Sequence, residues 1–324
     1  MAIGTGSRKQ RSLVRLAALV AGIGALVLSG CATTETIYNT NRNADTVSVV
    51  SRATFRVIDT IPVGQRPIGI AVNPARTLAY AANSGSNSVS VISTASNSVV
   101  ATVAVGARPF GVDINQAGTR VYVANSEGQS VSVIDTATNT VTATVTVGDG
   151  PTGVALNRAG TFAYVTNQLG DAVSAIDIAT NTVAATIPVG KRPMGLAVNR
   201  AGSLVYVANV GSDTVSVISA DTKTVVGTID VGAGPIDLAI GPSDAFVYVA
   251  NQRGNSVSVI NAATNDVTRT ISVAEGPTGI EVDPDGSVLY AVNRLTNAVS
   301  VISLSTHTVI GTIRETGREV ATVL

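Results

Sequence analysis

The chain has 324 residues, with 21 basic and 21 acidic side chains, one cysteine, one histidine and no tryptophan. Its formal net charge is zero, so electrostatics give little reason to expect nucleic acid or an anionic membrane surface as a partner. One histidine provides no imidazole cluster for copper or zinc, and four phenylalanines provide no aromatic platform for stacking bases or sugars.

Residues 1–30 have the pattern of a cleaved secretory signal. Four basic residues, the last of them Arg15, precede an apolar run at residues 16–28, which is shorter than the roughly 20 residues that span a bilayer. The run ends in Leu-Ser-Gly-Cys, and this resembles the bacterial lipoprotein signal. The resemblance implies that Cys31 is lipidated and becomes the mature N-terminus. The alternative is an ordinary buried thiol.

This interpretation predicts a lipid-anchored protein on the extracytoplasmic side of a cell membrane. Residues 31–35 would form a short tether, because the first tyrosine, Tyr38, follows closely. Cleavage would remove four basic residues and no acidic one, leaving an excess of acidic residues. We therefore expect the anchor to be the only membrane contact.

The remainder of the chain is a seven-fold repeat with a period of 42 residues. The tyrosines mark it, and an asparagine follows each tyrosine by three positions. The tyrosines are Tyr38, Tyr80, Tyr122, Tyr164, Tyr206, Tyr248 and Tyr290. Such a period indicates one supersecondary unit stacked on copies of itself.

Each unit predicts four short strands. In the third copy they are residues 121–125, 130–135, 140–147 and 152–157, separated by turn-forming residues. Val, Ile and Thr dominate with period 2, and no stretch between turns has helical periodicity. Four antiparallel strands repeated about every 40–45 residues predict an all-β propeller of seven blades over 36–324.

The repeat also carries a family resemblance. Residues 164–167 read YVTN, and other copies read YVAN, YAAN, YNTN and YAVN. Together with the Ser-Val-Ser-Val-Ile-Asp and Val-Gly-x-x-Pro-x-Gly segments, this resembles the YVTN-repeat β-propeller family. The resemblance implies the propeller fold and an extracytoplasmic location, and it implies little about activity.

The two ends of the repeat predict how the ring closes. The first copy begins at its tyrosine strand and lacks the preceding innermost strand. Residues 319–324 have the phase of that missing strand, so we expect them to pair with the Tyr38 strand. Closure of this kind removes exposed sheet edges.

Features present in every copy are interpreted as structural. We expect the tyrosines to pack between blades with the hydroxyl at a polar edge. The asparagines should end strands and favour turn or left-handed conformations. His307, the only histidine, should lie in a turn between the two outer strands.

Departures from the repeat are the candidate functional positions. The turn leading into each innermost strand and the turn between the second and third strands should share one face. Arginines are unevenly distributed there: Arg294, Arg318, Arg42, Arg66 and Arg108 fall on four consecutive blades. One interpretation is a solvated face of mixed charge. The other is a basic arc whose guanidinium groups hold a carboxylate, a phosphate or an acidic partner.

The innermost strands show a second departure. Positions that are small in most copies are occupied by Asp113, Asp237 and Glu281, which should face the central channel. They are either hydrated structural carboxylates or ligands of a metal such as Ca²⁺. Propeller lactonases are similar in fold, and some use a channel metal.

The sequence thus predicts a monomeric envelope lipoprotein that acts as a non-catalytic scaffold for an envelope protein or small anionic ligand, without a cofactor. The alternative is a lactonase-like hydrolase with a channel metal at Asp113, Asp237 and Glu281. Nucleic-acid binding is disfavoured by the charge.

Overall fold

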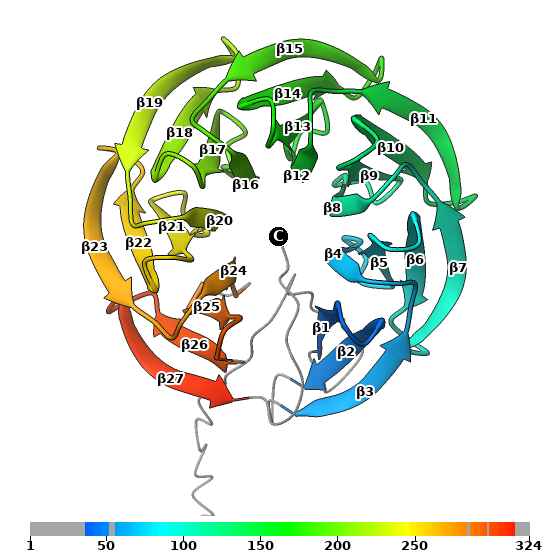
Figure 1. Cartoon of the computed structure of the whole chain (residues 1–324), viewed down its shortest axis with the longest axis horizontal. Helices are drawn as coiled ribbons and strands as arrows, with labels where there is room; N and C mark the ends of the chain where they lie inside the picture. Colours follow the sequence, from blue (N-terminus) through cyan, green and yellow to red (C-terminus); the bar gives the residue numbers. More distant parts are fainter. Residues whose placement is uncertain (1–35, 52–55, 284–285, 297, 315–324) are drawn as a thin grey trace, which may run out of the picture.

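The computed structural model describes residues 36–51, 56–283, 286–296 and 298–314. These residues form seven antiparallel sheets arranged as blades around a central axis, which confirms the seven-bladed propeller (Figure 1). No helix in the described ranges is long and apolar enough to cross a membrane.

The first four blades follow one another in sequence. Blade 1 contains β1 (Thr36–Asn41), β2 (Thr46–Ser51) and β3 (Val57–Pro62). Blade 2 contains β4 (Pro67–Val72), β5 (Leu78–Asn83), β6 (Ser88–Ser93) and β7 (Ser98–Ala104). Blade 3 contains β8 (Pro109–Ile114), β9 (Arg120–Asn125), β10 (Ser130–Asp135) and β11 (Thr140–Thr146). Blade 4 contains β12 (Pro151–Leu156), β13 (Phe162–Asn167), β14 (Ala172–Asp177) and β15 (Thr182–Pro188).

The last three blades repeat the same plan. Blade 5 contains β16 (Pro193–Val198), β17 (Leu204–Asn209), β18 (Thr214–Ser219) and β19 (Thr224–Asp230). Blade 6 contains β20 (Pro235–Ile240), β21 (Phe246–Asn251), β22 (Ser256–Asn261) and β23 (Asp266–Ser272). Blade 7 contains β24 (Pro277–Val282), β25 (Val288–Asn293), β26 (Ala298–Ser303) and β27 (Thr308–Arg314).

The described part of blade 1 has three strands, and each other blade has four. The fourth strand of blade 1, expected from residues 319–324, lies outside the described residues. Ring closure by the C-terminal strand therefore remains a prediction. The proposed signal at 1–30, the tether at 31–35, Cys31 and Arg318 also lie outside them.

The hydrophobic core lies between neighbouring blades. One cluster joins Tyr122 and Val133 of blade 3 to Val165 and Ile176 of blade 4, all with no exposed surface. Alternation at period 2 makes this possible, because each sheet presents one apolar row to the blade before it and another to the blade after it. The innermost strands of consecutive blades contact one another and surround the axis.

The tyrosines pack between blades as expected, and all seven are at most 2% exposed. The expected polar partner of the hydroxyl is missing in part, because the buried hydroxyls of Tyr80, Tyr122, Tyr164 and Tyr206 have no hydrogen-bond partner among the described residues. The Tyr38 hydroxyl donates to Oδ1 of Asn97, 2.9 Å away in the next blade. Tyr248 makes the corresponding contact with Nε2 of His307 at 3.2 Å. His307 lies in the turn between β26 and β27, as expected.

The strand-ending asparagines differ from the prediction. They do end the tyrosine strands, but none of them adopts a left-handed conformation. The buried Asn125 side chain instead donates to the hydroxyls of Ser130 and Ser132, at 3.2 and 3.0 Å. Its amide also lies against Gly106, where an added Cβ would come within 2.6 Å. The asparagine side chain therefore links its strand to the following strand by hydrogen bonds, and its role is not to form the turn.

Candidate functional site

The turns on one side of the ring form a surface that we call the arginine face. It consists of the turns leading into the innermost strands and the turns after the tyrosine strands. Backbone hydrogen bonds hold the two turns together: Ser84 N donates to Arg66 O at 3.0 Å, and Ser126 N donates to Arg108 O at 2.9 Å. The structure thus confirms that these turns share a face.

Two neighbouring turn positions on this face share the space for one large side chain. In blade 2 the large residue is at the first position and in blade 4 it is at the second. Arg66 has a φ of 53°, a left-handed conformation that costs a non-glycine residue roughly 1–2 kcal/mol. In blade 4 the same position is Gly150, and a Cβ there would lie 2.8 Å from Cγ of Leu169. In blade 2 the residue matching Leu169 is Gly85, which leaves space for the Arg66 side chain. Arginine is therefore present at Arg66 despite a backbone that favours glycine.

Arg42 is the partly buried member of this group. Burial is the main cause that lowers its pKa, and the charges of Arg66, Arg294 and Arg108 lower it further. Arg108 is neutralised by Glu127, whose Oε1 lies 2.7 Å from its Nη1. Among the described residues, Arg42, Arg66 and Arg294 take part in no ion pair. The result is a half-buried positive charge surrounded by further positive charge.

The opposite side of the same face is largely neutralised. Asp171 binds Nζ of Lys191 at 2.7 Å, and Asp213 binds Nη2 of Arg253 at 2.8 Å. Both aspartates also accept a backbone N–H, from Arg192 and Gly234 respectively. These carboxylates connect one turn to the next, so they leave little free negative charge.

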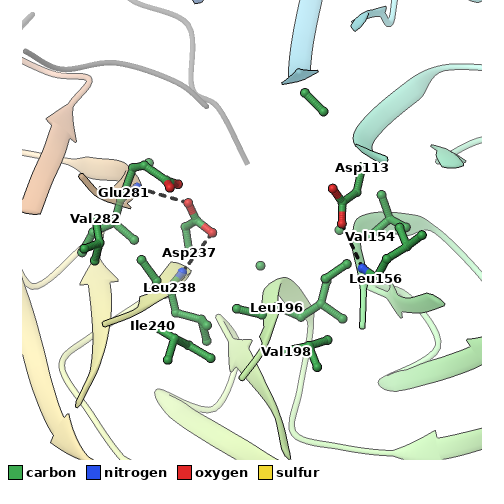
Figure 2. Close-up of a pocket in the computed structure, with 18 of the residues that line it drawn as sticks. Asp113, Val154, Leu156, Leu196, Val198, Asp237, Leu238, Ile240, Glu281 and Val282 are labelled. Carbon is green, nitrogen blue, oxygen red and sulfur yellow. Dashed lines mark hydrogen bonds between the residues drawn. The ribbon is translucent and has the colours of Figure 1, made fainter. Parts of the chain in front are cut away.

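A second site lies inside the ring, where a cavity of about 520 Å³ is lined by residues of β4, β8, β12, β16, β20 and β24. Its walls combine valine, leucine and isoleucine side chains with alanine and glycine residues, and they expose about as much polar as apolar surface. Four carboxylates also line it, Asp113, Asp237, Glu281 and Asp283, of which the first three are labelled in Figure 2. Most of the lining residues come from the second half of the innermost strands and from the turns that follow, and two, Tyr290 and Val292, come from β25. The cavity therefore opens toward the face opposite the arginines.

Two of the carboxylates act as connections between blades. Asp113 Oδ2 accepts the N–H of Leu156 in the next blade at 2.9 Å, and its Oδ1 accepts Ile114 N–H at 2.7 Å. Asp237 does the same with Ile280 at 3.2 Å and Leu238 at 2.9 Å. Burial raises the pKa of Asp113 to about 6 and that of Asp237 to about 7, although these N–H groups act in the opposite direction.

Glu281 has a different environment. Its carboxylate takes part in no hydrogen bond or ion pair with the described residues. Enclosure by the ring raises its pKa to about 8, with further contributions from the charges of Asp237 and Asp113. The side chain is exposed to the cavity, so water there reduces the effect of burial on its pKa. Burial and the two neighbouring negative charges all favour the protonated carboxyl.

Asp113, Asp237 and Glu281 are not gathered into one group in the described structure, and a metal site at these residues stays a prediction. Asp237 and Glu281 lie on one side of the cavity and Asp113 lies on the other (Figure 2). Among the described residues, no group of three Asp, Glu, His or Cys side chains is arranged to hold a metal ion. All three side chains line the cavity, as the period-2 alternation predicts, but Asp113 on blade 3 lies across it from Asp237 and Glu281 on blades 6 and 7.

Two further charged residues line the cavity, Arg200 and Asp283, and neither is among the candidates predicted from the sequence. Asp283 replaces an asparagine of the repeat and accepts the N–H groups of Ser287 and Val288 at 2.9 and 3.2 Å. Comparison with Asn199, which accepts the corresponding N–H groups in blade 5, could have identified Asp283 as another departure from the repeat.

Two family models match parts of the chain. A YNCE-like β-propeller model matches residues 205–322, and a seven-bladed β-propeller lactonase model matches residues 136–229. No curated protein matches the chain.

Solved structures resemble the whole ring. A structure titled Kuenenia stuttgartiensis hydrazine synthase matches with a TM-score of 0.78 and 21% identity, covering 86% of this chain and 94% of that one. A protein of unknown function from Desulfotomaculum acetoxidans also has a TM-score of 0.78, at 14% identity, with coverages of 88% and 96%. The dihydro-heme d1 dehydrogenase NirN matches with a TM-score of 0.70 and 14% identity, covering 87% of this chain and 64% of NirN. Together, the family models and the solved structures support the seven-bladed β-propeller fold of this chain.

Proposed function

We propose that this protein is a membrane-anchored, extracytoplasmic β-propeller lipoprotein that binds an anionic ligand or an acidic protein surface through its arginine face. One observation supports this most directly. Arg42 is half-buried among Arg66, Arg108 and Arg294, and no described acidic side chain neutralises it. The role is non-catalytic, with the rigid ring acting as a scaffold for the binding face.

An anion would relieve the repulsion among these side chains. Guanidinium groups stay protonated and present planar pairs of donors that match carboxylate and phosphate oxygens. A hydrogen bond to a charged group contributes about 1.5–3 kcal/mol. Arg66 and Arg294 are exposed, so an incoming anion can reach them without displacing a protein partner.

The proposed location depends on the N-terminal segment. Lipidation of Cys31 would hold the ring at the membrane, and partners would then be other envelope components. Replacing Cys31 with serine should release the protein from membrane fractions and abolish labelling by radioactive palmitate. Retention of both properties would contradict the anchor.

The scaffold role is tested by crosslinking in intact envelopes followed by mass spectrometry. The triple variant Arg42→Gln, Arg66→Gln, Arg294→Gln should lose the principal crosslinked partners. Arg192→Gln, an exposed arginine on the neutralised side of the same face, should retain them. An unchanged set of partners in the triple variant would contradict the proposal.

The lactonase-family match to residues 136–229 favours a second candidate, a propeller hydrolase. The described residues offer no three-ligand metal site to support it. Calorimetric titration with Ca²⁺ tests this candidate: binding that is lost in Asp237→Ala would support it, and no binding would exclude the Ca²⁺-dependent form.

A further inference from the structure

The channel cavity has the characteristics of a small-molecule site. Ligand pockets typically have volumes of about 300–1,000 Å³, and the volume here is about 520 Å³. Leu156, Leu196, Val198, Leu238 and Ile240 lie around it (Figure 2). These side chains provide an apolar surface that an organic body can contact.

The charged groups at the cavity are mainly acidic. Asp237 on β20, Asp113 on β8 and Asp283 after β24 face it together with Glu281, against one base, Arg200 after β16. The three aspartates already accept backbone N–H groups. Glu281 is the exception, because its carboxylate has no hydrogen-bond or ion-pair partner in the described part of the chain.

We propose that this cavity binds an organic cation, with an ammonium group against Glu281 and Asp237 and an apolar body along the valine, leucine and isoleucine walls. A carboxylate in apolar surroundings is costly unless it is paired, and an ammonium group provides both charge and hydrogen-bond donors. Asp237 lies beside Glu281, so two carboxylates can share the ammonium donors (Figure 2).

A metal ion is a poorer occupant. Ca²⁺ takes about six to eight oxygen ligands, whereas only two carboxylates, Asp237 and Glu281, adjoin here (Figure 2). The cavity is separate from the arginine face, so an experiment that contradicts one proposal leaves the other standing.

Calorimetric titration of the purified full chain with n-hexylammonium tests the proposal. At about pH 9 the amine is still largely protonated and Glu281 is ionised. We expect saturable binding that is at least about tenfold weaker in Glu281→Gln and at least about tenfold weaker for hexan-1-ol, equivalent to about 1.4 kcal/mol or more. The matched control is Glu275→Gln in the same blade, exposed and outside the cavity, which should bind like the wild type.

A second measurement needs no variant. Affinity of the wild type should fall as the pH is lowered toward about 6, because the folded-state pKa of Glu281 is about 8 and a protonated carboxyl cannot neutralise the cation. Equal affinity for hexan-1-ol, unchanged binding in Glu281→Gln, binding independent of pH, or no saturation by hexylammonium would each overturn the proposal. Tighter binding of Ca²⁺ than of hexylammonium would overturn it in favour of a metal site.

Discussion

At the scale of single residues, the charged side chains that depart from the repeat differ in whether the protein provides them with hydrogen-bond or ion-pair partners. Asp113 and Asp237 each accept two backbone N–H groups, one of them from the following blade, so their role is at least partly structural. Glu281 and Arg42 have no comparable partners among the described residues. These two therefore mark the positions at which a ligand could replace the missing interaction.

Glu281 should make stability depend on pH. Its pKa is about 8 in the folded protein and about 4.5 when unperturbed, so the folded state binds this proton more tightly and stability falls as pH rises through that window. Glu281→Gln should therefore raise the melting temperature at pH 9 and change it little at pH 4.5. Burial lowers the pKa of His307, so its contribution to stability rises with pH. This contribution is the same in the wild type and in Glu281→Gln, so it cancels when their melting temperatures are compared.

Thermal unfolding of the wild type and of Glu281→Gln between about pH 4.5 and pH 9 provides the measurement. A stabilisation by Glu281→Gln that is equal at both ends of the range would contradict the account of its pKa.

At the scale of the strand, glycine in the innermost strands reflects the close approach of neighbouring blades. A Cβ on Gly111 would lie 2.4 Å from the carbonyl oxygen of Thr152 in blade 4. Asp237 occupies the same repeat position in blade 6, where strand pairing resumes one residue earlier and so includes Asp237. The exception is therefore accompanied by a change in local pairing.

Gly111→Ala should lower the free energy of unfolding by about 1–3 kcal/mol, the usual cost of overpacking. Gly170→Ala is a suitable control, because its added Cβ would meet nothing closer than 3.6 Å and should change stability by less than about 0.5 kcal/mol. Denaturant unfolding of the two variants checks this. Equal stability would show that blade 3 can relax as blade 6 does.

The strands could be predicted from the sequence because their signals are local and repeated seven times. The tyrosine spacing gave the blade number, and alternation placed Asp113, Asp237 and Glu281 in the channel. The distances across the channel could not be predicted, because they depend on which blades carry the carboxylates. Nor could the pairing of Arg108 with Glu127 and of Arg253 with Asp213 be predicted, because these contacts depend on side-chain direction.

At the scale of the whole molecule, the ring brings distant parts of the sequence together. The charges of Arg294 in blade 7 and Arg66 in blade 2 both act on Arg42 in blade 1. The proposed binding face thus spans the junction where the two ends of the repeat meet. Its geometry depends on how that junction is closed.

Deleting residues 318–324 should cost much more stability than a tail deletion usually does. Without that strand, blade 1 would keep three strands and expose an unpaired edge. Calorimetric melting of the deletion variant should show a clear drop in melting temperature. An unchanged value would refute closure by the C-terminal strand.

The most direct test of the proposed function is calorimetric titration of the purified chain with citrate at low salt, comparing the wild type with Arg42→Gln. We expect saturable binding to the wild type that weakens at least about tenfold in Arg42→Gln, because a charge-assisted hydrogen bond is lost. Arg192→Gln should bind citrate as the wild type does. No citrate binding, or equal binding by Arg42→Gln and the wild type, would contradict the assignment of the arginine face as an anion site.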